Sequence, residues 1–191
     1  LSRWGDKYSD RVVGGREIDE LAPNYRISEP QSAVAAAQLT KLNDIVARRI
    51  HVGEFLTAQL KNAPGVIPPG IAKGDTHSYW FYMVRLELAR FKVPRAELCA
   101  ALNAEGVACG AGYIPRPVYR YPVFQNHNFF GGAWPVRDTG LTTMDYRQVS
   151  CPVAQAILDD CLVFKITEAM SDAYLEKVGR AVTTVTKRLA R

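Results

Sequence analysis

The sequence predicts an α+β fold of the α/β class: one long helix beside a small domain whose short, mainly antiparallel sheet is covered by helices. The order of predicted elements after residue 65 is strand, helix, strand, long loop, helix, short strand, helix. That order fits helices layered on a small sheet. The chain has 191 residues and is 48% hydrophobic, which is enough for one core. The charged fraction of 23% is that of an ordinary folded protein.

A helix is predicted from Ser28 to about Leu60. Ser28 and Gln31 fit a capping box, and Pro30 lies in the first turn, where a missing N–H does no harm. Helical spacing of apolar residues continues through Val34, Leu39, Leu42, Val46, Leu56 and Leu60. The small side chains of Ala33–Ala37 permit another backbone or subunit to approach. We therefore expect this helix to bridge two domains, and to leave an exposed patch that favours self-association where the second domain is absent.

The small domain is predicted from the patterns that follow. Residues 66–76, rich in Pro and Gly, form a connection, and residues 114–149 form a long loop of the kind that is usually functional. Aromatic and β-favouring residues indicate strands, and apolar residues at helical spacing indicate helices. The predicted strands are 77–88, 107–113 and 162–166, and the predicted helices are 95–105, 152–161 and 171–189, the last capped by Ser171 or Asp172.

Charge and cysteine content restrict the function classes. The net charge of +5 comes from scattered Lys and Arg, so it is weak evidence for nucleic acid, and an anionic small ligand such as a phosphate or nucleotide suits it equally. The four cysteines form no C-x-x-C pair, which favours reduced, mostly buried thiols in a cytoplasmic protein. No apolar run approaches the roughly 20 residues of a bilayer span, and no signal peptide opens the sequence.

Few local motifs point to chemistry. A nucleophile elbow, a Walker loop, a dinucleotide fingerprint and H-E-x-x-H are absent from the sequence. Three histidines, His51, His77 and His127, are far apart in sequence and indicate no metal site. Asn24-Tyr25-Arg26 immediately precedes a helix start, where free N–H groups, an amide and a guanidinium together could hold an anion. A surface capping segment is the competing interpretation.

An ordered series of motifs resembles the DegT/StrS family of aminotransferases. Ala22-Pro23-Asn24-Tyr25-Arg26-Ile27-Ser28-Glu29-Pro30-Gln31 is similar to the family's G-x-N-Y-R-M-x-E-x-Q stretch. His77-Ser78-Tyr79-Trp80 resembles its H-x-Y-x-x-Y strand. Further matches are Arg95-Ala96-Glu97-Leu98, Ala104-Glu105-Gly106-Val107, Gly112-Tyr113-Ile114-Pro115 and Cys151-Pro152-Val153-Ala154. The resemblance runs along nearly the whole chain in the family's order.

The resemblance implies a dimeric, fold type I enzyme with pyridoxal 5'-phosphate (PLP) and a site at the subunit interface. Such an enzyme moves an amino group from glutamate or glutamine to a keto sugar, often nucleotide-linked, or to a cyclitol. Carried over, Asn24 would contact the PLP phosphate of the partner subunit, and Arg26 would lie near it. His77, Tyr79, Tyr113 and His127 become substrate-side candidates. No metal, nucleic acid or membrane partner is implied.

The resemblance is to the carboxy-terminal half of the family. Residues 1–27 would then be the end of the large cofactor-binding domain, residues 28–62 the interdomain helix and residues 63–191 the small C-terminal domain. None of the eight lysines lies in the family's Schiff-base context, so this chain alone is expected to be inactive. Arg116 follows Pro115 where many relatives continue with Leu-His, and Lys165 stands where Pro is commoner. The alternative hypothesis is a non-catalytic partner, or split subunit, that completes the site of a full-length relative.

Overall fold

The computed structural model describes residue 25 and residues 27–191. The chain divides into two compact units, the first ending at Ile45 and the second running from Val46 to Arg191. The second unit contains the sheet, its covering helices and most of the candidate residues. The domain boundaries expected at residues 27 and 62 stay predictions.

The helix expected over 28–60 is two helices, α2 (Glu29–Leu39) and α3 (Leu42–Leu60). Its predicted start is right, because the Ser28 N–H donates to Gln31 Oε1 at 3.2 Å. The prediction of one continuous helix is wrong at Thr40 and Lys41, which separate the two helices. The Thr40 hydroxyl donates to Ala37 O at 2.8 Å, and the Lys41 N–H bonds to Gln38 O at 3.0 Å. These local bonds replace the helical ladder for one turn, as threonine side chains often do.

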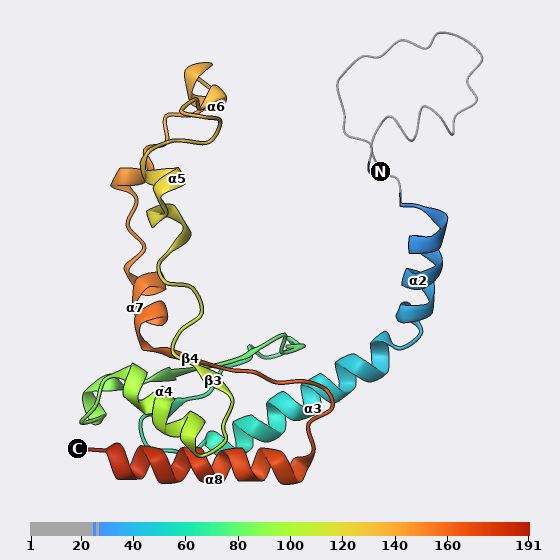
Figure 1. The fold of residues 1–191 in the computed structure, drawn as a ribbon, viewed down its shortest axis with the longest axis vertical. Coiled ribbons are helices and arrows are strands. Elements are labelled where there is room, and N and C mark those ends of the chain that lie inside the picture. The colour runs from blue at the N-terminus through green and yellow to red at the C-terminus, as the bar shows by residue number, and fades with distance from the viewer. Residues whose placement is uncertain (1–24, 26) are drawn as a thin grey trace. The chain divides into compact units, whose positions relative to one another are not determined.

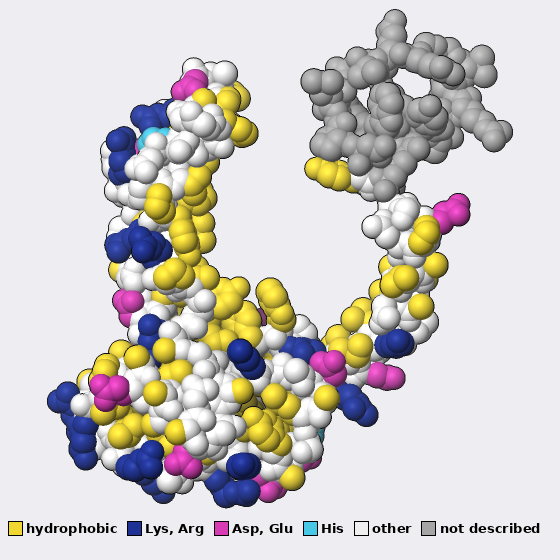
Figure 2. Space-filling model, viewed as in Figure 1, with side chains coloured by type: hydrophobic (Ala, Val, Ile, Leu, Met, Phe, Trp, Pro, Cys, Tyr) yellow, Lys and Arg dark blue, Asp and Glu magenta, His cyan; other side chains and the backbone are white. Residues whose placement is uncertain are grey.

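Helix α2 buries no side chain among the described residues. Val34 is 62% exposed and Leu39 is 65% exposed, and Figure 2 shows hydrophobic side chains along this helix on the molecular surface. The patch expected on the small-residue helix face is therefore present on α2.

The second unit is built on one four-stranded sheet. The strands are β1 (Val66–Ile67), β2 (Tyr82–Leu86), β3 (Cys109–Gly110) and β4 (Cys161–Phe164), in the order β1-β2-β4-β3. Each neighbouring pair is antiparallel, which confirms the expected short antiparallel sheet. Side chains alternate along β2, so Tyr82, Val84 and Leu86 are buried while Arg85 is exposed and pairs with Asp160.

Helices cover the buried face of the sheet. The C-terminal part of α3, helix α4 (Arg95–Ala104) and helix α8 (Asp172–Leu189) each contribute a stripe of buried apolar residues to one core. Figure 1 shows α8, in red, with α4 beside it. Ser171 caps α8 by accepting a hydrogen bond from the Tyr174 N–H. Both α4 and α8 lie where their apolar spacing predicted, and α7 (Pro152–Asp160) leads directly into β4.

The expected strands are shorter in the structure. Strand β2 begins at Tyr82 instead of residue 77, because Tyr79 has a positive φ of 49°, which no strand residue adopts. The expected strand 107–113 reduces to β3, since Gly112 turns the chain with a φ of 104°. Strand β1 lies inside the segment expected to be a connection only. A short 3₁₀ turn, η1 (Leu88–Arg90), follows β2.

Strands β3 and β4 are antiparallel neighbours, so the whole stretch between them is the connection of one hairpin. This stretch contains the segment expected to be a long loop, and it holds several short helical turns. They are η2 (Val118–Arg120), α5 (Pro122–Gln125), α6 (Pro135–Asp138) and η3 (Tyr146–Gln148). We call residues 111–150 the insert. Among the described residues, no helix is both long and apolar enough to cross a bilayer.

The crossing of α3 and α8 requires Gly179. A Cβ at this position would lie 2.7 Å from the Gln59 Cβ, closer than real Cβ atoms approach. We expect Gly179→Ala to lower the free energy of unfolding by about 1–3 kcal/mol, because overpacking outweighs the helix propensity gained. Urea unfolding followed by circular dichroism measures this. Gly70→Ala is the matched control, since a Cβ there meets nothing within 4 Å. Equal stability of the two variants would contradict the tight crossing.

Candidate functional site

Arg49 of α3 fixes the segment that precedes β2. Its guanidinium donates to the carbonyl oxygens of Tyr79 and Trp80, and it forms an ion pair with Glu168 at 3.1 Å. These bonds occupy two carbonyls that a longer β2 would have used in the ladders to its neighbours on either side, β1 and β4. A hydrogen bond from its own backbone N–H, together with the bond from Arg49, holds the pKa of the Glu168 carboxyl below its usual range. The backbone of residues 79–80 is thereby tied to α3.

Tyr79 is buried, with 1% of its surface exposed, and its ring lies against Gly53 of α3. A Cβ on residue 53 would overlap the ring carbons. The ring also stacks on Tyr82, whose hydroxyl shares a 2.8 Å hydrogen bond with Thr57. Burial raises the pKa of both tyrosines. In this chain Tyr79 is a core residue, and its expected contact with substrate stays a prediction.

His77 is exposed and lies directly beside Tyr79. Its Nδ1 accepts a hydrogen bond from the Tyr79 N–H at 2.8 Å, and the two rings are 4.3 Å apart. Because Nδ1 accepts, the neutral ring carries its proton on Nε2. His77 is exposed, and its expected role in substrate binding stays a prediction.

Tyr113 packs against Phe81, the residue that precedes β2. The two rings stack with centroids 4.9 Å apart, and Tyr113 is 51% exposed. Trp80, next to Phe81, is 79% exposed. Exposed aromatic faces of this kind pack well against sugar C–H groups or a nucleotide base. We call Trp80, Phe81 and Tyr113 the aromatic shelf.

His127 lies elsewhere, in the insert, within a second aromatic cluster. Its ring is 4.8 Å from Trp134, and Trp134 stacks on Tyr146 at 5.6 Å. His127 has a positive φ of 52°, which turns the chain so that the ring enters the cluster. The structure therefore pairs His77 with Tyr79, pairs Tyr113 with Phe81, and places His127 in a separate cluster within the insert.

Hydrogen bonds decide the tautomer of His127. Arg137 Nη1 lies 2.9 Å from Nδ1, and because an arginine only donates, Nδ1 accepts. The proton of the neutral ring is then on Nε2, which is buried and faces Asp145 Oδ1 at 3.4 Å without a hydrogen bond to any described residue. Arg147 donates to both Asp145 oxygens and, with His127, holds the pKa of this carboxyl far below its usual range.

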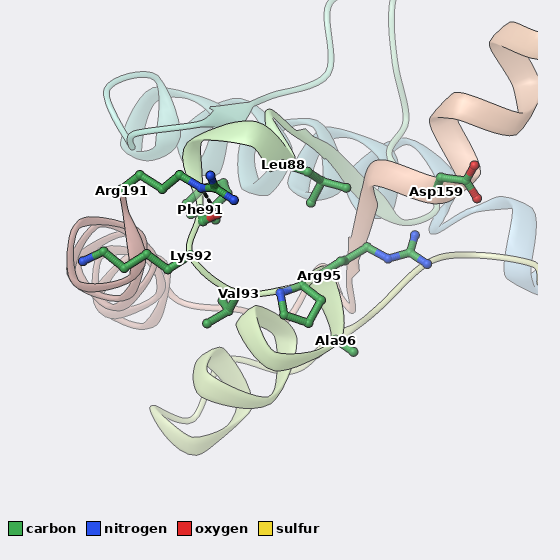
Figure 3. Close-up of a pocket in the computed structure, with 9 residues that line it drawn as sticks. Leu88, Phe91, Lys92, Val93, Arg95, Ala96, Asp159 and Arg191 are labelled. Atoms are coloured by element: carbon green, nitrogen blue, oxygen red, sulfur yellow. Dashed lines mark hydrogen bonds between the residues drawn. The ribbon is translucent and has the colours of Figure 1, made fainter.

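A cavity of about 530 Å³ lies at the start of α4, away from these clusters. Lys92, Arg95 and Arg191 supply its cations, but Figure 3 shows that the Lys92 and Arg95 side chains point in opposite directions. Arg95 is also engaged, since it donates to the carbonyls of Leu158 and Cys161. The cations do not converge on one point, so the cavity is not assigned a ligand. Within residues 27–191 no group of three or more His, Cys, Asp or Glu is placed to hold a metal ion.

Two expected site residues, Asn24 and Arg26, lie outside the described residues. Sequence reasoning missed Arg49, Phe81 and the Asp145–Arg147 pair as parts of the candidate site. Arg49 could be recognised only as one basic residue in a helix, because its bonds run to carbonyls some 30 positions later. The sequence contains the run Asp145-Tyr146-Arg147, but this run has neither helical nor strand spacing. The sequence pattern therefore gave no reason to choose it as part of a site.

Residues 2–183 match the DegT/DnrJ/EryC1/StrS aminotransferase family. The chain belongs to this family. The match covers both units and nearly every motif that the sequence offered. The roles of the candidate residues stay predictions.

The relatives include the spore coat polysaccharide biosynthesis protein SpsC of Bacillus subtilis, 25% identical over 186 residues, which are 95% of this chain and 42% of SpsC. Among solved structures, an aminotransferase from Psychrobacter cryohalolentis is 19% identical with a TM-score of 0.71, over 97% of this chain and 46% of that one. S. venezuelae DesV, in complex with a ketimine intermediate, is 22% identical with a TM-score of 0.68, over 95% and 42%. These likenesses confirm the fold. The chain spans about two fifths of the length of such relatives.

Asp145 gives the insert a dependence on pH. Because its pKa is lowered in the folded chain, its stabilising effect is complete above the ordinary value of about 3.9 and is lost as pH falls below that value. We expect the near-ultraviolet circular dichroism of the aromatic cluster to weaken from pH 5 to pH 2, and Asp145→Asn to weaken it already at pH 5. The exposed Asp75→Asn serves as the control. Identical pH profiles for wild type and Asp145→Asn would contradict the assignment.

Proposed function

We propose that this chain is the C-terminal portion of a PLP-dependent aminotransferase. The whole enzyme would move an amino group from glutamate or glutamine to a keto sugar, often nucleotide-linked, or to a cyclitol. The observation that carries the proposal is the family match over residues 2–183 in a chain that spans about two fifths of its relatives. A cytoplasmic homodimer with its site at the subunit interface is part of the same proposal.

The described residues do not fit covalent attachment of PLP. The seven described lysines, from Lys41 to Lys187, are all exposed. A Schiff-base lysine reacts as the neutral amine, which requires a desolvated or cationic surrounding that lowers its pKa. PLP supplies the electron sink for amino transfer when bound, and in this proposal the lysine that holds it belongs to the upstream part of the enzyme.

This chain would instead contribute groups that bind and orient. The aromatic shelf would offer ring faces to the acceptor, and His77 Nε2–H would offer a hydrogen-bond donor. Asn24 and Arg26 are proposed to contact the PLP phosphate, Asn24 across the dimer. Both precede the N-terminus of α2, which adds a partial positive charge favourable to an anion. The basic net charge of +5 suits a nucleotide-linked acceptor.

The first test is covalent trapping. We incubate the chain with PLP, reduce it with borohydride and map the adducts by mass spectrometry. Because the described lysines are solvated and equivalent, we expect only scattered, substoichiometric labelling that rises with PLP concentration. A full-length relative such as SpsC is the positive control. Stoichiometric labelling of one lysine in this chain would overturn the proposal that the Schiff-base lysine lies elsewhere.

The alternative, a non-catalytic subunit that completes the site of a full-length relative, makes a different prediction. The tagged chain, co-expressed with such a relative, should co-purify with it and change its transaminase activity. Asn24→Ala should abolish the change in activity, because the amide would no longer reach the partner's PLP phosphate. Asn62→Ala, an exposed asparagine after α3, is the matched control. Absence of a complex would reject the alternative and leave the main proposal standing.

A further inference from the structure

Two of the four cysteines lie against each other. Cys99 on α4 and Cys109 on β3 have their sulfur atoms 3.5 Å apart, although both are free thiols. A disulfide needs about 2.0 Å between the sulfurs, so the two sulfur atoms must move about 1.5 Å closer for the bond to form. The other two cysteines differ: Cys161 is buried with its thiol directed to Leu158 O, and Cys151 is exposed.

The backbone around the pair is held in place by Asn103. Its amide nitrogen donates to Cys99 O at 2.8 Å and to Cys109 O at 3.0 Å, and its oxygen lies 3.4 Å from the Cys109 nitrogen. Gly106, with a φ of 82°, makes the turn that brings β3 back along α4. One side chain therefore bonds the main chains of both cysteines. The thiols are preorganised, and little entropy is lost when a bond forms between them.

We propose that Cys99 and Cys109 form a reversible disulfide when the protein meets a low-molecular-weight disulfide such as oxidised glutathione. Cys109 is the entry point, because it is half-buried on the edge strand of the sheet while Cys99 is only 6% exposed. This modification site is independent of the proposed aminotransferase function.

The thiol–disulfide exchange proceeds in two steps. The Cys109 thiolate attacks one sulfur of oxidised glutathione, the glutathione S–S bond breaks, and one glutathione leaves as a thiolate that takes up a proton. The Cys99 thiolate then attacks the Cys109 sulfur of the mixed disulfide, and the second glutathione leaves in the same way. The two protons lost by the cysteines are those gained by the leaving groups. The cysteines are oxidised by two electrons, and oxidised glutathione is reduced by two.

Burial makes the rate of thiol–disulfide exchange at Cys109 depend steeply on pH. Burial and the neighbouring Cys99 thiol raise the pKa of the Cys109 thiol to about 12. The attacking thiolate is therefore scarce at neutral pH, and its fraction rises about tenfold for each pH unit between 7 and 9. The exchange rate should follow that slope. An ordinary thiol, with a pKa near 8.5, begins to level off in the same range.

The experiment oxidises the folded chain with glutathione disulfide, blocks free thiols with an alkylating agent and maps the products. Digestion combines trypsin with a protease that cleaves after Glu105. Trypsin alone would leave Cys99 and Cys109 in one peptide, and cleavage after glutamate alone would leave Cys109 in one peptide with Cys151 and Cys161. We expect the two peptides to be linked, the mass to fall by two hydrogen atoms, and dithiothreitol to reverse both. Cys99→Ser should stop at the mixed disulfide on Cys109, while Cys151→Ser and Cys161→Ser should leave the link intact.

Each other outcome overturns the proposal. Alkylation of both Cys99 and Cys109 after oxidation would show that the two thiols do not form a disulfide. A stable glutathione adduct on Cys109 in the native chain would show that Cys99 does not resolve it. A link from either residue to Cys151, or to a second molecule, would show that a different pair is the oxidised one. A rate independent of pH between 7 and 9 would remove Cys109 as the attacking group.

Discussion

The contact between Tyr79 and helix α3 sets the position of the segment that leads into β2. Gly53 leaves room for the ring, and Arg49 bonds the carbonyls of residues 79 and 80. While Arg49 holds those carbonyls, the hydrogen-bond ladder cannot extend to residues before Tyr82. Strand β2 therefore begins at Tyr82. As a result His77 and Trp80 emerge on the exposed side with a fixed orientation. A buried tyrosine thus determines which neighbours are available to a ligand.

The insert is organised by a different principle. It has its own aromatic cluster around Trp134. It also has its own charge network, in which the Asp145 carboxylate pairs with Arg147 and faces His127, while Arg137 donates to the Nδ1 of the same His127 ring. Aromatic contacts give it shape, and the charge network fixes the tautomer of His127. The candidate residues therefore lie on two separately stabilised parts: a shelf attached to the core and a cluster that depends on ionised Asp145.

Sequence patterns predicted those parts of the fold in which neighbours along the chain decide the outcome. Helices α4 and α8 follow from their apolar spacing, and the start of α2 follows from Ser28 and Gln31. The break at Thr40 and the late start of β2 were missed, because each depends on a hydrogen bond that competes with a regular ladder. The candidate site divides in the same way. His77 was found from a motif, whereas its setting depends on bonds from distant residues that no spacing reveals.

The hairpin connection between β3 and β4 has a consequence for how this family can diversify. The two strands are adjacent in the sheet, so the insert leaves and rejoins the core at one edge. The entropy of closing such a connection grows only with the logarithm of its length. Residues can be gained or lost there at little cost to the folded state. Evolution can thus reshape this surface while the layer of α3, α4 and α8 beneath the sheet remains under separate selection for packing.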